Sequence, residues 1–143
     1  MEDMIDDFIT FFVAGQETTA NTLAFCFIEI AKNPLVAKKL REEIDSVLGD
    51  RNEVTNEDLT KLKYVSSVIK ETLRLWGPAE GPTREVDVDD FEINGLNIPK
   101  GTIVTTSNYL NARVESNFSD PYLFNPERFM TKDSRFYSFL KFF

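Results

Sequence analysis

The sequence contains no histidine and a single cysteine, Cys26, so the commonest ligands of protein-bound metals are scarce. One cysteine also excludes an internal disulfide framework. No apolar run reaches the roughly 18 residues that a membrane-spanning helix needs. Residues 1–7, MEDMIDD, are acidic and lack the basic start and apolar stretch of a signal peptide. We therefore expect no metal cluster, no disulfide and no membrane segment in these residues.

Basic residues are also few. The chain has 16 Lys and Arg against 24 Asp and Glu, which gives a formal net charge of -8. Such a chain repels phosphate backbones and anionic lipid headgroups, so we expect no nucleic-acid partner. Apolar residues are plentiful, at 42% of the composition with 13 phenylalanines. In a chain of 143 residues, this composition predicts one folded domain rather than disorder.

The first half of the chain has the patterns of helices. Residues 4–31 contain no proline and are apolar on nearly every side, which predicts one long helix buried between other elements. The pair Asn33-Pro34 ends it, because a residue before proline is driven out of the helical region. Residues 35–48 have one apolar and one charged face, which is typical of a surface helix, and Gly49 stops that helix.

Two more helices are expected before residue 80. Thr55, with Asp58 three residues later, forms a capping-box pattern at the start of a short helix. Residues 63–76, KYVSSVIKETLRLW, have the clearest helical period in the chain. Gly77-Pro78 ends this last helix.

After residue 80 the pattern changes to strands and coil. Asn94-Gly95 between alternating apolar residues predicts a β-hairpin, and the β-branched residues 102–110 predict a further strand. Residues 119–129 have two prolines and no period, so we expect ordered coil anchored by aromatic side chains. The sequence thus predicts an α+β fold that is mainly α, with a helical part (1–80), a small antiparallel β part (81–110) and an irregular coil (111–143).

Residues 11–21, FFVAGQETTAN, place polar groups inside the long helix. Gly15 costs about 1 kcal/mol relative to alanine there, and it forms a small-residue stripe with Thr18 and Thr22. Such a stripe lets a flat group approach the helix backbone, while the threonine hydroxyls bond one turn back. Glu17, if buried, needs a partner, water or a proton-transfer role. The alternative is close helix packing at Gly15 with Glu17 turned outward, and this stretch by itself favours the alternative.

Three charged residues are candidates for an internal ion cluster. Glu71 and Arg74 are neighbours at i, i+3, opposite the apolar stripe of their helix. Arg128 lies in the irregular coil, whose backbone groups lack ladder partners. A buried Glu71 shared by both guanidiniums would anchor the coil. The alternative is a solvent-exposed pair worth about 0.2–0.5 kcal/mol.

Two other residues have ordinary interpretations when taken alone. Cys26 lies between Phe25 and Phe27 and is expected to be a small core residue rather than a reactive thiol. Arg84 follows the last helix and by itself is a surface arginine.

The motifs AGQETT, ETLRLWGP, GPTREV, INGLNIPKGT and FNPERF occur in this order along nearly the whole chain. Each is short, but the ordered set resembles the cytochrome P450 family of haem-thiolate monooxygenases, and within it the sterol side-chain hydroxylases that act on cholesterol. The resemblance implies a partial P450 fold: a long buried distal helix, further helices, a small antiparallel sheet and a proximal coil. It also implies hydroxylation of a lipophilic substrate, a sterol such as cholesterol, with dioxygen.

The same resemblance implies partners for the full-length protein. They are heme b as cofactor, an NADPH–cytochrome P450 reductase as electron source and the endoplasmic reticulum membrane as location. On the distal side of the haem, Ala14 and Gly15 would open a groove beside bound oxygen. Thr18 would hold a hydrogen-bonded water or hydroperoxide, and Glu17 would help to deliver protons.

The remaining matches lie on the other side of the haem or at its edge. Glu71 and Arg74 match the family's E-x-x-R pair, and Arg128 matches the third member of a structural salt-bridge triad. Arg84 matches the arginine that pairs with a haem propionate, which is a charge-assisted contact.

The family's haem-ligand loop, Phe-x-x-Gly-x-Arg-x-Cys-x-Gly, does not occur in these residues. Residues 134–143 read SRFYSFLKFF, and residues 136–139 resemble only the approach to that loop. Cys26 lies on the distal helix, on the wrong side of the haem to bind the iron, so no metal ligand is assigned. Gly77 stands where the family commonly has a proline after the E-x-x-R helix. We therefore interpret residues 1–143 as an internal fragment of one P450 catalytic domain, inactive alone. The alternatives are a non-catalytic truncated product that acts as an interaction module, and a family member that rearranges or dehydrates an oxygenated lipid.

Overall fold

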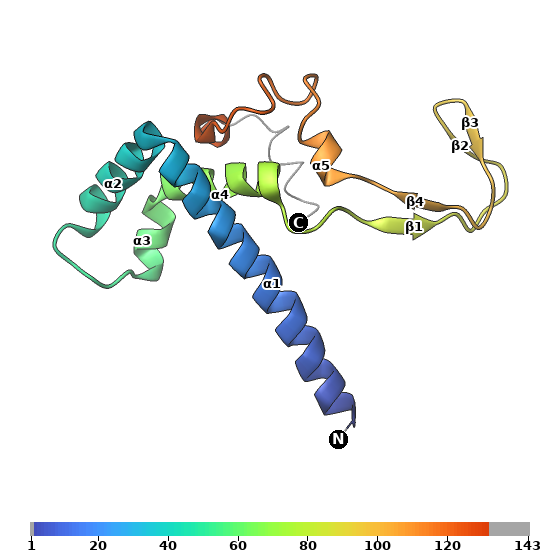
Figure 1. Cartoon of the computed structure of the whole chain (residues 1–143), viewed down its shortest axis with the longest axis horizontal. Coiled ribbons are helices and arrows are strands. Elements are labelled where there is room, and N and C mark those ends of the chain that lie inside the picture. The colour runs from blue at the N-terminus through green and yellow to red at the C-terminus, as the bar shows by residue number, and fades with distance from the viewer. Residues whose placement is uncertain (1, 132–143) are drawn as a thin grey trace.

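The computed structural model describes residues 2–131, and in this range helices come first and short strands follow (Figure 1). The helical part comprises α1 (Glu2–Lys32), α2 (Pro34–Leu48), α3 (Asn56–Lys61) and α4 (Lys63–Trp76). The rest comprises β1 (Thr83–Glu85), β2 (Phe91–Ile93), β3 (Leu96–Ile98), β4 (Ile103–Thr105), α5 (Asn108–Asn111) and the 3-10 helix η1 (Pro126–Phe129). The fold is α+β and mainly α, as the sequence predicts.

The predicted helix boundaries are confirmed where the signals are local. α1 ends one residue before Asn33, and Pro34 is the first residue of α2, where its missing N–H costs nothing. Thr55 caps α3: its Oγ1 accepts a hydrogen bond from the amide of Asp58 (3.2 Å), and Asp58 Oδ2 accepts one from the amide of Thr55 (3.0 Å). The capping box read from the sequence is therefore present.

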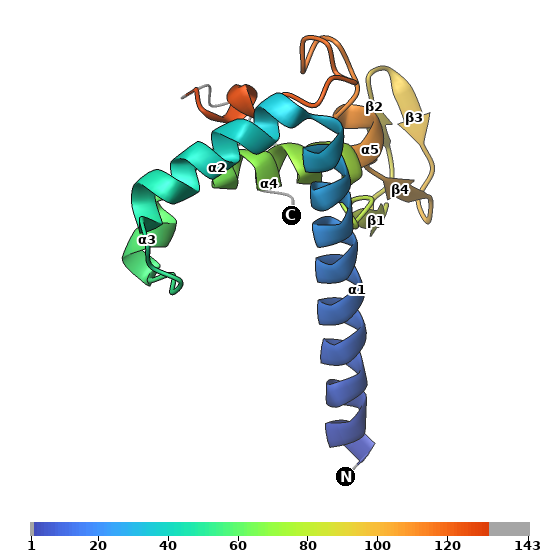
Figure 2. The ribbon, with the colours of Figure 1, turned by 60° about the vertical axis from the view of Figure 1, so that its left-hand side comes forward.

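The first half of α1 is exposed, so within the described residues the predicted burial of this helix is observed only toward its C-terminal end. Phe8, Phe11 and Phe12 are 67%, 78% and 55% exposed. This half projects away from the other described elements (Figure 2), whereas Cys26 and Glu29 near the other end are buried against α4. The apolar pattern is correct for burial, but no described element lies beside these turns. None of the described helices combines the length and the apolar character that crossing a membrane requires.

The core lies where the second half of α1 crosses α2 and α4. Its buried members are Cys26, Val36, Leu40, Tyr64, Val68, Leu75 and Phe124. α4 also receives a cap from α2, because Leu62 before it offers no side-chain acceptor. Both oxygens of Glu43 accept amide hydrogen bonds there, from Tyr64 (2.7 Å) and Val65 (2.9 Å). α4 is therefore fixed at its N-terminus by a carboxylate from another helix.

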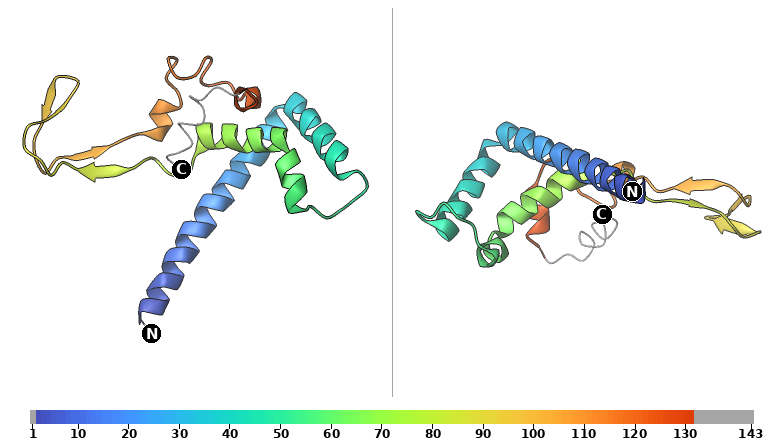
Figure 3. Two further views of the ribbon diagram at one scale, coloured as in Figure 1. Left: turned by 180° about the vertical axis from the view of Figure 1, so that it is seen from behind. Right: turned by 90° about the horizontal axis from the view of Figure 1, so that it is seen from below.

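The strands form two antiparallel ribbons that extend away from the helices on one side (Figure 3). β1 pairs with β4, which places Arg84 opposite Val104. β2 pairs with β3 through Asn94-Gly95, which confirms the predicted hairpin. β4 is shorter than the strand expected over 102–110, because Ser107 Oγ accepts the amide of Leu110 (3.2 Å) and starts α5.

The segment between α5 and η1 is ordered coil that returns over α4. Its aromatic anchors Phe118 and Phe124 are buried, as is Phe129 in η1. This agrees with the expectation of coil held by aromatic side chains, with a turn of 3-10 helix added. The prediction for residues 136–139 lies outside the described residues.

The cap of α3 predicts how the stability of the protein depends on pH. The Arg51 guanidinium, together with the hydroxyl and amide of Thr55, holds the pKa of the Asp58 carboxyl well below its usual range. A lowered native pKa means that Asp58 contributes its full stabilisation above its ordinary pKa of about 4 and loses it as the pH falls further. The stability advantage of wild type over Asp58→Asn should therefore be larger at pH 7 than at pH 3 in urea unfolding. An advantage that does not change with pH would contradict this, and Asp50→Asn, at an exposed position, is the control.

Candidate functional site

A carboxylate in the middle of α4 is shared by two arginines. Glu71 is 0% exposed, and both its oxygens bind Arg74: Arg74 Nε donates to Oε2 (2.7 Å) and Nη2 donates to Oε1 (2.8 Å). Arg128 Nε also donates to Oε1 (3.3 Å), and so does the amide of Asn125 (2.8 Å). The three side chains that the sequence places in one cluster therefore meet, and the solvent-exposed alternative is wrong.

The two guanidiniums use their remaining donors on backbone carbonyls of the coil. Arg74 Nη1 donates to the carbonyls of Ala112 (2.7 Å) and Pro121 (2.8 Å), and its guanidinium lies over the ring of Phe118. Arg128 Nη2 donates to the carbonyl of Asp120 (2.8 Å). A coil has no ladder to satisfy its carbonyls, so these bonds replace one. The ion cluster thus fastens the coil to α4.

The other side of α4 faces an apolar groove. This groove, about 480 Å³ in volume, is lined by Thr18, Thr19, Thr22, Leu23 and Cys26 of α1, Ile69 and Leu73 of α4, and Pro78 and Ala79. Thr18 is the polar residue that the sequence singled out, and its Oγ1 donates to the carbonyl of Ala14 (2.7 Å). Thr22 makes the same bond to the carbonyl of Thr18 (2.8 Å). These bonds one turn back confirm the predicted threonine geometry and leave the hydroxyl oxygens free to accept.

Thr18 and the other residues predicted beside it are exposed. Ala14, Gly15 and Glu17 do not line the groove, and Glu17 makes no side-chain hydrogen bond or ion pair within residues 2–131. A Cβ added to Gly15 would meet nothing within 4 Å. Close helix packing at Gly15 is therefore not observed among the described elements, and the structure brings only Thr18 of this group to the groove.

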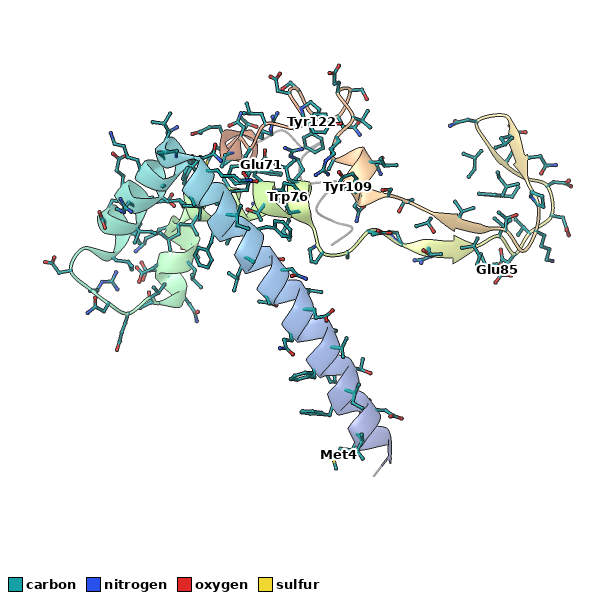
Figure 4. All side chains as sticks on the ribbon, viewed as in Figure 1. Met4, Glu71, Trp76, Glu85, Tyr109 and Tyr122 are labelled. Atoms are coloured by element: carbon teal, nitrogen blue, oxygen red, sulfur yellow. The ribbon has the colours of Figure 1, made fainter. Side chains whose placement is uncertain are left out.

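The contact that joins α1 to the end of α4 is not predicted from the sequence. The indole N–H of Trp76 donates to Glu29 Oε1 (3.0 Å), and its ring stacks on Phe25 with centroids 5.0 Å apart. Trp76 is the last residue of α4, the helix that also carries Glu71 (Figure 4). Glu29 is only 7% exposed. An isolated acid in the apolar run FCFIEIA was the available signal, because a buried carboxylate requires a donor.

Arg84 lies on the β1–β4 ribbon, apart from the groove. It is exposed, and its guanidinium donates to the carbonyl of its neighbour Thr83 (2.9 Å). It lines a second pocket, of about 340 Å³, with apolar residues that include Val86 and Phe91 and with the acidic residues Glu85 and Asp87. Its charge is thus available to an acidic group.

The described residues hold no group of three or more His, Cys, Asp or Glu that could bind a metal. Burial raises the pKa of the Cys26 thiol, with a smaller opposing effect from a hydrogen bond with Thr72. Cys26 is therefore a core thiol, as expected, and poorly suited to ionise.

The comparisons with known proteins match most of the chain. A family model described as Cytochrome P450 matches residues 1–142. Cytochrome P450 3A6 of Oryctolagus cuniculus is 40% identical over 131 residues, which are 92% of this chain and 26% of that protein. Cytochrome P450 71B22 of Arabidopsis thaliana is 40% identical over 120 residues (83% and 24%). Flavonoid 3'-monooxygenase of the same plant is 36% identical over 122 residues (85% and 24%). The chain spans about a quarter of the length of the curated relatives it matches.

Proposed function

The chain belongs to the cytochrome P450 family, and from that premise we propose that it carries the oxygen-side helix and the coil anchor of a haem-dependent monooxygenase. The reaction proposed for the whole protein is hydroxylation of a lipophilic substrate with dioxygen and electrons from a reductase. The observation that carries the proposal is the Thr18 hydroxyl in an otherwise largely apolar groove. Family membership implies haem, and we propose heme b.

Thr18 would hold a hydrogen-bonded water in the groove. Its O–H donates to Ala14, so its oxygen is available to accept a hydrogen bond from one water molecule. Leu23, Ile69 and Leu73 line the same groove with apolar side chains, and Thr18 itself is exposed to solvent. Glu17, exposed and one residue earlier, would supply protons from the solvent side.

We propose that Arg84 lies at the edge of the haem, and we assign no axial ligand among the described residues. Arg84 would hold a propionate, because its guanidinium is exposed and lies beside apolar residues. When bound, haem supplies the oxygen-activating chemistry. Cys26 does not serve as its ligand in this proposal, since its thiol is buried in the core.

For the substrate we propose a sterol such as cholesterol, on the resemblance of the sequence motifs. The reductase would be an NADPH–cytochrome P450 reductase, and the whole protein would lie at the endoplasmic reticulum membrane. The name of one similar protein, flavonoid 3'-monooxygenase, indicates a different lipophilic class for that protein. Competition between a sterol and a flavonoid for the whole enzyme would separate the two classes.

Thr18→Ala tests the proposed role of Thr18. In a full-length protein that carries these residues, the variant should release several-fold more peroxide per NADPH, because no hydroxyl remains to orient the water. Peroxide and hydroxylated product are measured together. The control is Thr10→Ala, at an exposed position on the same helix. Equal coupling in wild type and Thr18→Ala would count against the role.

A second candidate is a non-catalytic interaction module, and it rests on a different observation. The exposed side chains of Phe8, Phe11 and Phe12 form an apolar surface of the kind that binds partners. That role requires these rings and not the Thr18 hydroxyl, so the coupling measurement distinguishes the two candidates.

A further inference from the structure

We propose that Gly81 is a positioning residue that fixes one wall of the apolar groove. Its φ is +147°, and an added Cβ would lie 2.1 Å from the backbone oxygen of Thr106. Side-chain carbons do not approach a backbone oxygen so closely. Any other residue at position 81 must therefore move the Thr106 backbone or the segment that carries it.

Gly81 stands inside a short set of backbone hydrogen bonds, which we call the 80–108 lock. The amide of Asn108 donates to the carbonyl of Glu80 (2.6 Å), and the amide of Thr106 donates to the carbonyl of Pro82 (3.2 Å). The two bonds flank Gly81 on both sides along the chain. The close approach of Gly81 to Thr106 is thus the condition for both bonds.

The lock holds one end of the segment that forms the groove wall. Pro78 and Ala79 line the groove opposite Thr18, Thr22 and Cys26 of α1. The other end of the segment is Trp76, which is tied to α1 through Glu29 and Phe25. A segment this short that is fixed at both ends has little freedom, so a shift at Gly81 reaches Ala79.

Gly81 thus affects the shape of the groove. Only its use, in setting which lipophilic ligands reach Thr18, rests on the proposed function. The geometry is independent of that function and is testable in the 143-residue chain.

The test compares Gly81→Ala with two controls. Gly101→Ala introduces a side chain at another positive φ (+84°) where a Cβ meets nothing within 4 Å, so it reports backbone strain alone. Thr55→Ala removes the cap of α3 and lowers stability far from the groove. Two measurements detect movement of the groove wall. One is amide hydrogen exchange at Thr106 and Asn108, and the other is the rate at which N-ethylmaleimide alkylates Cys26, the only cysteine.

We expect Gly81→Ala to raise amide exchange at Asn108 by about tenfold or more and Cys26 alkylation several-fold, because the lock opens locally. Gly101→Ala should change neither rate. Thr55→Ala should change them only in proportion to exchange in the whole chain. Wild-type rates at both sites in a folded Gly81→Ala protein would overturn the proposal.

If Gly81→Ala does not fold, amide exchange in the wild-type protein tests the proposal instead. The lock predicts slowed exchange for the Asn108 and Thr106 amides, and exchange at unprotected rates would overturn it. Failure of the lock leaves the Thr18→Ala coupling result unaffected, so the two proposals fail separately.

Discussion

Replacing Glu71 by alanine should lower the free energy of unfolding by about 3–5 kcal/mol, which is the usual effect of breaking a buried ion pair. The change leaves two guanidiniums without their counter-ion in a site where Glu71 and Arg74 are 0% and 1% exposed. Domains of this size have total stabilities of about 5–15 kcal/mol, so much of the stability is lost. Urea unfolding followed by the fluorescence of Trp76, the only tryptophan, measures the effect.

The matched control is Glu57→Ala in α3. Glu57 pairs with Lys61 at 2.7 Å, but its side chain is 78% exposed, so its loss should have little effect. Similar losses of stability in Glu71→Ala and Glu57→Ala would show that burial of the cluster is not what stabilises the chain.

Replacing Arg74 by lysine is expected to lower the free energy of unfolding by about 3 kcal/mol, although the charge is conserved. A single ammonium cannot reproduce the planar fork that binds both oxygens of Glu71 and the carbonyls of Ala112 and Pro121. The acceptors left unpaired are buried, which makes their loss costly. Limited proteolysis should also cut the coil between α5 and η1 faster in this variant than in wild type.

Arg51→Lys is the control for geometry. Arg51 also binds a carboxylate with two nitrogens, at 3.0 Å each to Asp58, but its side chain is 50% exposed. Water can replace its lost hydrogen bonds, so the loss of stability should be smaller than for Arg74→Lys. Equal losses would contradict a special role for the buried fork.

Local signals in the sequence predicted those parts of the fold that local interactions decide. Asn33-Pro34, the Thr55–Asp58 cap and the Asn94-Gly95 turn each act within a few residues. The burial of Glu71 is different. The spacing of Glu71 and Arg74 places them on one side of a helix, but only the coil, far away in sequence, decides that this side is covered.

The long helix shows that an apolar pattern alone does not decide whether a helix is buried. The apolar pattern of residues 4–31 predicts burial, and burial depends on which elements lie beside the helix. Among the described residues, only the second half of α1 has such neighbours, through Cys26 and Glu29. Gly81 was not predicted either, because the carbonyl of Thr106 that demands a glycine is 25 residues away in the chain.

α4 links the two parts of the candidate site. Its Ile69 and Leu73 face the groove that contains Thr18, while Glu71 and Arg74 hold the coil on the other side. A change in the ion cluster is therefore expected to disturb the coil first, and the groove only through movement of the whole helix.

The exchange rate of one amide in the wild-type protein tests the shared carboxylate most directly. The amide of Asn125 donates to Glu71 Oε1 (2.8 Å) although Asn125 lies in coil. We predict that this amide exchanges about a hundredfold or more slowly than in an unstructured peptide, comparably with the Tyr64 and Val65 amides bound to Glu43. Exchange of Asn125 at the rate of an unstructured peptide, with Tyr64 and Val65 still protected, would contradict a Glu71 that anchors the coil.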